Sequence, residues 1–292
     1  MLLNSVCVFT CVYSICMKFG LVVCTTACIL WRVIMNKLAA LFGTAVVALS
    51  SQVMASPLDA TNITVFDGQG SGSGWYGTQE DNEVEPRNGY GQKWDLEGFF
   101  QKGNNVSIVS GYNLKNGEKQ GRHHWTSGDI FIDINNDVTR GSRTWSNGNK
   151  TVKNTYGFDY VLDVNWSNLT YDIVKLDANS YTKTSYFKNN QAANPWLYAG
   201  GGDVIGNGAF SLSSLTDAES GFLGGKHYYA NGFDLSFLGE NADFNLHFTM
   251  QCGNDDLRGK GKTPTTPVPV PSVAALMGIG LLALGRARRR KK

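Results

Sequence analysis

The stretch that decides the fold is YVLDVNWSNLTYDIVKL, residues 160–176. Apolar β-branched and aromatic residues recur along both of its halves, and Asn165-Trp166-Ser167-Asn168 separates the halves. A period of two puts alternate side chains on opposite faces of a strand, and Asn and Ser favour turns. The stretch therefore predicts two antiparallel strands, Tyr160–Val164 and Leu169–Leu176, joined as a hairpin.

Further short runs of the same kind lie along the chain from Ser56 to Lys262, without a sustained helical period between them. Many short strands without intervening helices predict an all-β fold, a single antiparallel β-sandwich or jelly-roll-like domain over residues 56–262. Besides the hairpin, the expected strands cover residues 63–66, 106–109, 129–134, 181–187, 233–238 and 244–250.

Charge is segregated along the chain. All 24 acidic residues lie between Asp59 and Asp256, whereas residues 56–262 hold 17 of the 26 basic residues, which gives this body a net charge of −7. A basic nucleic-acid footprint is absent, so we expect no nucleic-acid partner. The remaining basic residues lie near the two ends of the chain, where positive charge determines membrane topology.

The N-terminal part predicts export. Met35-Asn36-Lys37, an apolar run from Leu38 to Leu49 and small residues up to Ala55 form the three parts of a signal peptide, residues 35–55, with a helical apolar segment. Signal peptidase would cut between Ala55 and Ser56. Residues 1–34 are apolar and rich in cysteine, and we interpret them as an upstream extension of a chain that starts at Met35. If Met1 is the start, an extended signal or signal anchor results.

The C-terminal part has three sections of its own. A Pro/Thr linker covers residues 263–267, and Val268-Pro269-Val270-Pro271-Ser272 follows it. The apolar run from Val273 to Gly285 would rise about 20 Å as a helix, short of a hydrocarbon core of about 30 Å. The basic cluster that ends the sequence should remain cytoplasmic. It contains Arg286, Arg288, Arg289 and Arg290.

Residues 268–292 resemble the PEP-CTERM sorting signal of Gram-negative surface proteins, which exosortases process. Val270 stands where that signal usually has glutamate, as in its V-P-x-P variants, which leaves the responsible exosortase open. The resemblance implies transient attachment to the cytoplasmic membrane through a short transmembrane helix, and then a cell-surface or extracellular location. An ordinary C-terminal membrane anchor is the alternative.

Three segments of the body also resemble exosortase-dependent surface proteins. They are Leu246–Asp255, Gly128–Asp133 and Tyr156–Asp163. The resemblance implies a role in the cell envelope or extracellular matrix, in association with exopolysaccharide and without a known reaction. We therefore expect a non-enzymatic protein with no catalytic residues and no required cofactor.

Several residues could carry other chemistry. Asp133, Asn135 and Asp137 offer oxygen ligands at alternate positions, as a calcium loop does, although Val138 and Thr144 break the EF-hand pattern. A turn in which Asn and Asp bond their own backbone is the simpler interpretation. Neighbouring His123 and His124 should point to opposite faces of a strand, which disfavours a shared metal.

Cysteine, tryptophan and glutamate leave two alternatives open. Cys252 is the one cysteine of the body, so no internal disulfide forms there, and we expect a buried structural thiol. Exposed tryptophans would make a carbohydrate-binding module, and two glutamates across a cleft would make a glycan hydrolase. The candidate tryptophans are Trp75, Trp94, Trp125, Trp145, Trp166 and Trp196, and the candidate glutamates are Glu80, Glu83, Glu85, Glu97, Glu118, Glu219 and Glu240.

Overall fold

The computed structural model describes residues 58–66, 80–81, 83–84, 86, 91–140 and 149–265. Every described residue belongs to the unit Ser56–Lys292. The predicted signal peptide, its cleavage site at Ala55 and Ser56, and the tail of residues 268–292 lie outside the described residues. Among the described residues, no helix is long and apolar enough to cross a membrane.

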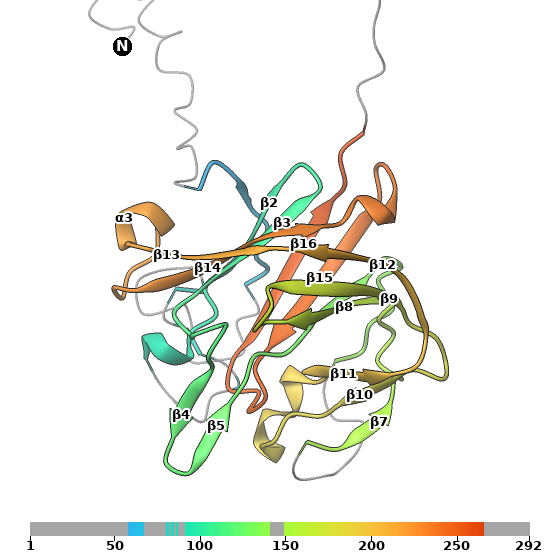
Figure 1. Cartoon of the computed structure of the whole chain (residues 1–292), viewed down its shortest axis with the longest axis horizontal. Helices are drawn as coiled ribbons and strands as arrows, with labels where there is room; N and C mark the ends of the chain where they lie inside the picture. Colours follow the sequence, from blue (N-terminus) through green and yellow to red (C-terminus); the bar gives the residue numbers. More distant parts are fainter. Residues whose placement is uncertain are drawn as a thin grey trace, which may run out of the picture. The chain divides into compact units, whose positions relative to one another are not determined.

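Strands dominate the described part of the chain (Figure 1). The elements are β1 (Thr61–Asn62), η1 (Gln92–Trp94), β2 (Gly98–Lys102), β3 (Asn105–Ser110), β4 (Glu118–Gln120), β5 (His123–Trp125), β6 (Ile130–Asp133), β7 (Thr151–Lys153), β8 (Tyr160–Asn165), β9 (Thr170–Lys175), β10 (Tyr181–Lys183), η2 (Lys188–Ala193), β11 (Leu197–Gly200), β12 (Asp203–Ala209), β13 (Ser211–Leu215), α3 (Asp217–Ser220), β14 (His227–Asp234), η3 (Ser236–Leu238), β15 (Asp243–Thr249) and β16 (Asp256–Lys262).

Two antiparallel sheets form a sandwich, which confirms the predicted all-β fold. One sheet has the order β1-β2-β3-β14-β13, and the other has the order β12-β9-β8-β6-β15-β16. The predicted hairpin is β8 paired with β9, with Tyr160 opposite Lys175 and Asn165 opposite Thr170. Leu169 donates its backbone N–H to the carbonyl of Asn165 at 2.8 Å and closes the turn.

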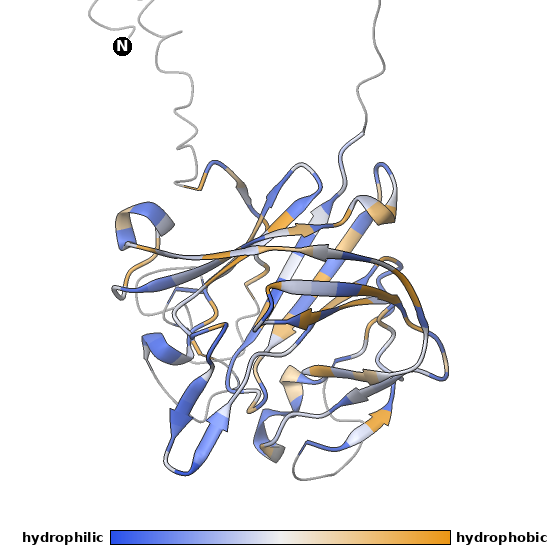
Figure 2. Cartoon of the chain, in the orientation of Figure 1, coloured by the Kyte–Doolittle hydropathy of each residue, from blue (hydrophilic) through white to orange (hydrophobic). Residues whose placement is uncertain are grey.

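The main core lies between these two sheets. Alternate residues of each strand face inward, as the period of two requires. On β15, for example, Phe244, Leu246 and Phe248 are fully buried in this core. Figure 2 shows hydrophobic and hydrophilic colours mixed along the strands of both sheets, as this alternation requires. Phe99 of β2 and Phe233 of β14 complete the core from the other sheet.

A third layer covers the outer face of the six-stranded sheet. This layer was not predicted from the sequence. β11, β10 and β7 form a three-stranded sheet. Its Val152 and Tyr198 pack against a second buried cluster that includes Phe131, Phe158 and Val161. The inner strands β6 and β8 are therefore apolar on both faces, which explains why their polar alternation is incomplete.

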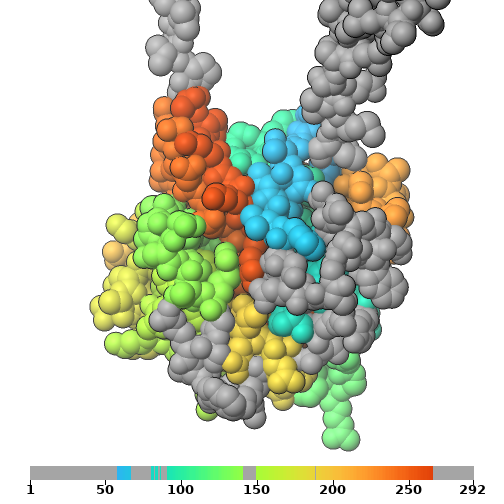
Figure 3. All heavy atoms as spheres, turned by 180° about the vertical axis from the view of Figure 1, so that it is seen from behind, coloured from blue at the N-terminus to red at the C-terminus, as the bar shows by residue number. Residues whose placement is uncertain are grey.

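The two sheets of the sandwich are joined along their sides. Ile63 donates its N–H to Phe99 of β2 at 2.9 Å, and Val65 donates to Arg258 of β16 at 2.9 Å, so this segment bridges both sheets. Figure 3 shows residues 58–66 against the last strands. On the other side, β12 runs into β13 through Phe210 alone and carries the chain from one sheet to the other.

Three predicted strands need correction. Residues 63–66 form bridging hydrogen bonds and one isolated bridge at Thr64, whereas the strand precedes them at β1. The strand expected over residues 181–187 ends at Lys183, because Ser185 bonds Asn194 and Asn190 instead of a neighbouring strand. The strand expected over residues 233–238 ends at Asp234, whose carboxylate accepts from the backbone and hydroxyl of Ser236 and starts η3.

Candidate functional site

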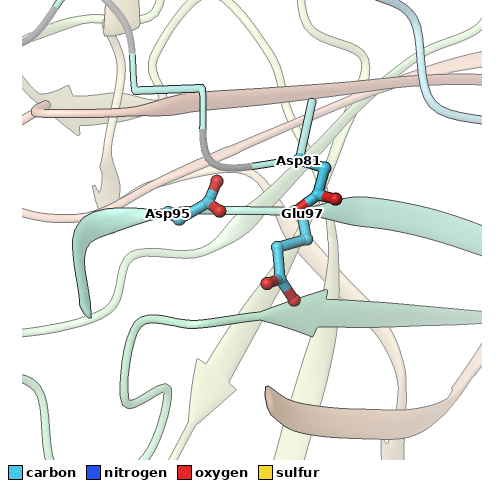
Figure 4. A group of neighbouring side chains, drawn as sticks. All are labelled: Asp81, Asp95 and Glu97. Atoms are coloured by element: carbon cyan, nitrogen blue, oxygen red, sulfur yellow. The ribbon is translucent and has the colours of Figure 1, made fainter. Parts of the chain in front are cut away.

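Three buried carboxylates converge at the entrance to β2 (Figure 4). Asp95 and Glu97 lie in the extended segment between η1 and β2, two residues apart, so both can project to one side. Asp81 comes from a separate segment. Oxygens of the three groups lie within 4.8 Å of one another. Repulsion between like charges at this distance requires compensation by a cation or by protons.

His227, the first residue of β14, supplies positive charge at this cluster. Its Nδ1 lies 2.7 and 2.8 Å from the two carboxylate oxygens of Glu97, and its Nε2 lies 3.0 Å from Oδ1 of Asp217. A carboxylate accepts hydrogen bonds, so the geometry fits an imidazolium that donates from both nitrogens. The side chains of His227 and Glu97 are completely buried.

The pKa directions agree with a charged histidine. Burial alone lowers the pKa of His227, but the hydrogen bonds and charges of Glu97 and Asp217 outweigh burial and raise that pKa above its usual value. Burial raises the pKa of Glu97, against the opposing effects of His227 and Gln92. The hydrogen bond from His227 lowers the pKa of Asp217.

The same groups hold the segment between β13 and β14. The backbone N–H of Leu223 approaches both oxygens of Asp81, at 3.3 and 3.2 Å, and that of Gly225 donates to Asp217 at 2.8 Å. Glu219 accepts from the backbone of Thr216 at 2.8 Å and caps α3. The cluster therefore fastens this segment to β2 and β14.

Asp81, Asp95 and Glu97 have the oxygen ligands that a divalent cation prefers. However, both Glu97 oxygens face His227, one of them also accepts from Gln92, and Asp81 accepts from Leu223. This internal pairing makes the cluster an ion-pair network that connects secondary-structure elements. Of these residues, only Glu97 was predicted as a candidate from the sequence. The Asp95-x-Glu97 spacing before a strand was the signal available for Asp95.

A second buried ionic group lies on the outer face of the six-stranded sheet. His247 Nδ1 is 2.7 Å from Oδ1 of Asp256, and Arg258 Nε donates to Oδ2 of Asp256 at 3.0 Å. The other nitrogen of His247 lies 2.8 Å from the carbonyl of Pro195, beneath the third sheet. Burial raises the pKa of Asp256, but His247, Arg258 and Arg140 outweigh it and lower the pKa to about 2.

Asp129 connects the same two layers. Its oxygens accept from the backbone N–H of Val164 in β8 at 2.9 Å and of Tyr198 in β11 at 2.7 Å. Burial raises the pKa of this carboxyl to about 8, with a further contribution from the charge of Asp163. Through these two hydrogen bonds, Asp129 fixes β11 over the sheet.

The predicted calcium loop forms a sequence of side-chain turns. Oδ1 of Asp133 accepts from the backbone N–H of Asn135 at 3.1 Å and of Asn136 at 2.8 Å, and Oδ1 of Asn135 accepts from Asp137 at 2.9 Å. Such bonds are those of Asx turns. They account for the residue types at these positions, and calcium binding there stays a prediction.

The described tryptophans and the cysteine are structural. Trp94, Trp125, Trp166 and Trp196 are all buried, which removes them as a platform for sugar stacking. Trp75 and Trp145 lie outside the described residues. Cys252 is buried, and burial raises the pKa of its thiol to about 12, so it is not ionised at neutral pH.

The described glutamates named for a hydrolase lie in different parts of the fold. Glu97 belongs to the cluster with the two aspartates, whereas Glu219 caps α3 and is exposed. Glu80 and Glu83 are buried, Glu118 is half-buried in β4, and Glu240 is exposed. Glu85 lies outside the described residues.

In comparisons with known proteins, no family model, no curated protein and no solved structure matches the chain.

Proposed function

We propose that the protein is an exported surface or matrix protein, non-enzymatic and associated with exopolysaccharide, which an exosortase-type enzyme sorts through its tail. The sequence of residues 268–292 carries this proposal: the V-P-V-P-S motif, the short apolar run and the arginine cluster follow one another in the order of a PEP-CTERM signal. The signal-like residues 35–55 supply the export step that such sorting requires.

The arrangement of the sandwich supports attachment through its ends. Thr61 of β1 pairs with Gln101 of β2, and the side-chain amide of Gln101 donates to the carbonyl of Lys262 at 2.7 Å. The described chain therefore enters and leaves the sandwich at the same end, as Figure 1 shows. A tail that continues from Lys262 would hold this end toward a membrane and present the opposite end to the surroundings.

The buried networks support a structural role over a catalytic one. The cluster of Asp81, Asp95 and Glu97 is buried and bonded to its own protein, and the Cys252 thiol is protonated and buried. A nucleophile or general acid needs access to a substrate. The described residues thus favour a binding or matrix protein.

The experiment is an intact-mass measurement of the protein from envelope and medium fractions of its native host. We expect a species that begins near Ser56 and ends near residues 268–272. A matched pair of variants sharpens the test: Arg288→Ala, Arg289→Ala and Arg290→Ala together should block processing, whereas Thr265→Ala in the linker should leave it unchanged.

A species that keeps Arg288 to Lys292 in the membrane fraction of the unaltered strain would overturn the sorting proposal and leave a plain C-terminal membrane anchor. A species confined to the cytoplasm with residues 35–55 intact would overturn export as well.

A further inference from the structure

A two-stranded ribbon, residues 115–125, projects from the end of the sandwich opposite the chain ends. β4 pairs only with β5 among the described strands, through Glu118 with Trp125, Lys119 with His124, and Gln120 with His123. Gly121, with φ of 61°, permits the two-residue turn between them. Figures 1 and 3 show the ribbon extending beyond the body from opposite viewpoints.

The ribbon is polar beyond what folding requires. Lys119, Arg122, His123 and His124 are exposed, and Figure 2 shows both strands in the hydrophilic colour. An isolated two-stranded ribbon is marginal in water unless it buries apolar side chains. Here that burial comes from Trp125 at the base alone, so the exposed side chains toward the tip contribute little to the core.

The charge of the ribbon is opposite to that of the body. Residues 115–125 contain Lys115, Lys119 and Arg122 against the single acid Glu118, whereas residues 56–262 as a whole carry a net charge of −7. Long-range repulsion by an acidic body disfavours a large polyanion lying across its surface. A projecting basic ribbon can contact such a chain at a distance from the body.

Aromatic rings lie on one face of the ribbon, at its base. Lys119 pairs with His124 and lies on the opposite face from His123 and Trp125, because successive strand residues alternate between faces. The exposed ring of His123 stacks on Trp125 with centroids 4.9 Å apart and an angle of 15° between planes. Half-buried Tyr186 lies 5.4 Å from His123, centroid to centroid. Exposed His123 and His124 show that both faces of the ribbon reach the solvent, so a flexible polymer that passes over the tip can meet rings on one face and a cation on the other.

We propose that the ribbon of residues 115–125, together with Tyr186, is the binding site for an acidic polysaccharide such as a polyuronate. Lys119 on one face and Arg122 at the turn attract the carboxylates, and His123 and Tyr186 contact sugar rings on the other face. The proposal deepens the exopolysaccharide association proposed above and rests on it for its biological setting, because the ribbon would then point away from the attached end of the protein.

The test measures binding of the protein, purified from its host, to immobilised polygalacturonate at low and at high salt. We expect Lys119→Glu with Arg122→Glu to weaken binding at low salt by about tenfold or more, because two attractive contacts become repulsive. The control, Lys226→Glu with Lys260→Glu, makes the same charge change at exposed positions outside the ribbon and should bind as the unaltered protein does.

His123→Ala, at an exposed position, tests the stacking contact separately and should weaken binding several-fold. Thermal melting followed by circular dichroism checks that each variant keeps its fold. Independently of any variant, binding of the unaltered protein to polygalacturonate should fall as salt is raised, and neutral dextran should not bind.

Several results would overturn the proposal. They are no binding of polygalacturonate by the unaltered protein, equal losses in the ribbon and control variants, equal binding of dextran, or tighter binding of duplex DNA than of polygalacturonate, which would make the partner a nucleic acid. This test does not depend on location, so a failure of export in the fractionation experiment and a failure of the ribbon in the binding experiment are distinguishable.

Discussion

At the scale of single residues, two buried histidines explain how the protein tolerates several carboxylates in its interior. His227 faces Glu97 and Asp217, and His247 faces Asp256. A buried carboxylate without a partner is costly, and each histidine places a ring nitrogen within 3.0 Å of a carboxylate oxygen. Each histidine also connects separate elements: His227 joins β14 to the segment before β2, and His247 joins β15 to β16.

Replacement of His227 tests the first of these networks. We expect His227→Gln to lower the free energy of unfolding by about 3–5 kcal/mol, because breaking a buried ion pair leaves an uncompensated charge. Chemical denaturation at pH 7 measures this change. His124→Gln, at an exposed position on the ribbon, should change the free energy by less than about 0.5 kcal/mol. Equal effects of the two substitutions would contradict the role given to His227.

At the scale of elements, the third sheet determines which faces of β6 and β8 are apolar. Phe158 is 3% exposed and lies with its ring centroid 5.3 Å from that of Phe131 and 5.6 Å from that of His247. It fills the space between the six-stranded sheet and the sheet of β11, β10 and β7. Two polar contacts also connect these layers. The backbone N–H of Tyr198 donates to Asp129, and a ring nitrogen of His247 lies 2.8 Å from the carbonyl oxygen of Pro195.

Truncation of Phe158 should loosen this layer. We expect Phe158→Ala to destabilise the protein by about 3–5 kcal/mol through the cavity it leaves. Hydrogen exchange should accelerate in residues 181–200 more than in β3 or β14, since the cavity adjoins the third sheet. As a control, Tyr181→Ala removes an aromatic ring that is 39% exposed on the same sheet and should have a much smaller effect. Uniform acceleration across both sheets of the sandwich would argue against a separate third layer.

At the scale of the whole molecule, buried carboxyls with opposite pKa shifts determine how stability depends on pH. The pKa of Asp256 is lowered from 3.8 to about 2, so the stability it contributes is present above about pH 4 and is lost as pH falls toward 2. The pKa of Asp129 is raised from 3.8 to about 8, so its contribution is complete below about pH 4 and is lost as pH rises through 8. The raised pKa of His227 acts in the same direction as that of Asp129.

We therefore expect the free energy of unfolding to decline as pH rises from about 4 to above 8, and to decline again in acid below about pH 4. Chemical denaturation across this range measures both declines. Asp129→Asn should make the alkaline decline shallower, because an amide does not titrate. An unchanged slope in that variant would show that Asp129 is ionised in the folded protein at neutral pH.

Some strands could be predicted from the sequence, and others could not. The hairpin of β8 and β9 and the strands β3, β6 and β15 follow from their local pattern of apolar residues. β12 and β13 escaped prediction because Gly206, Gly208 and a run of serines hide the pattern, and their strand conformation comes from pairing with β9 and β14. The conformation of such segments depends on strands that pair with them but lie far away in the sequence.

The sequence by itself determined the all-β class, the acidic body with its basic ends, and the order of the signal-like segments. Composition and the period of two are local properties, so they can be recognised without knowledge of neighbours. The tertiary structure alone decided the third sheet, the convergence of Asp81 with Glu97, and the pairing of Glu97 with His227, which is 130 residues away along the chain. A strand pattern specifies which side chains share a face, but the packing of sheets determines which faces meet, because it depends on contacts summed over the whole core.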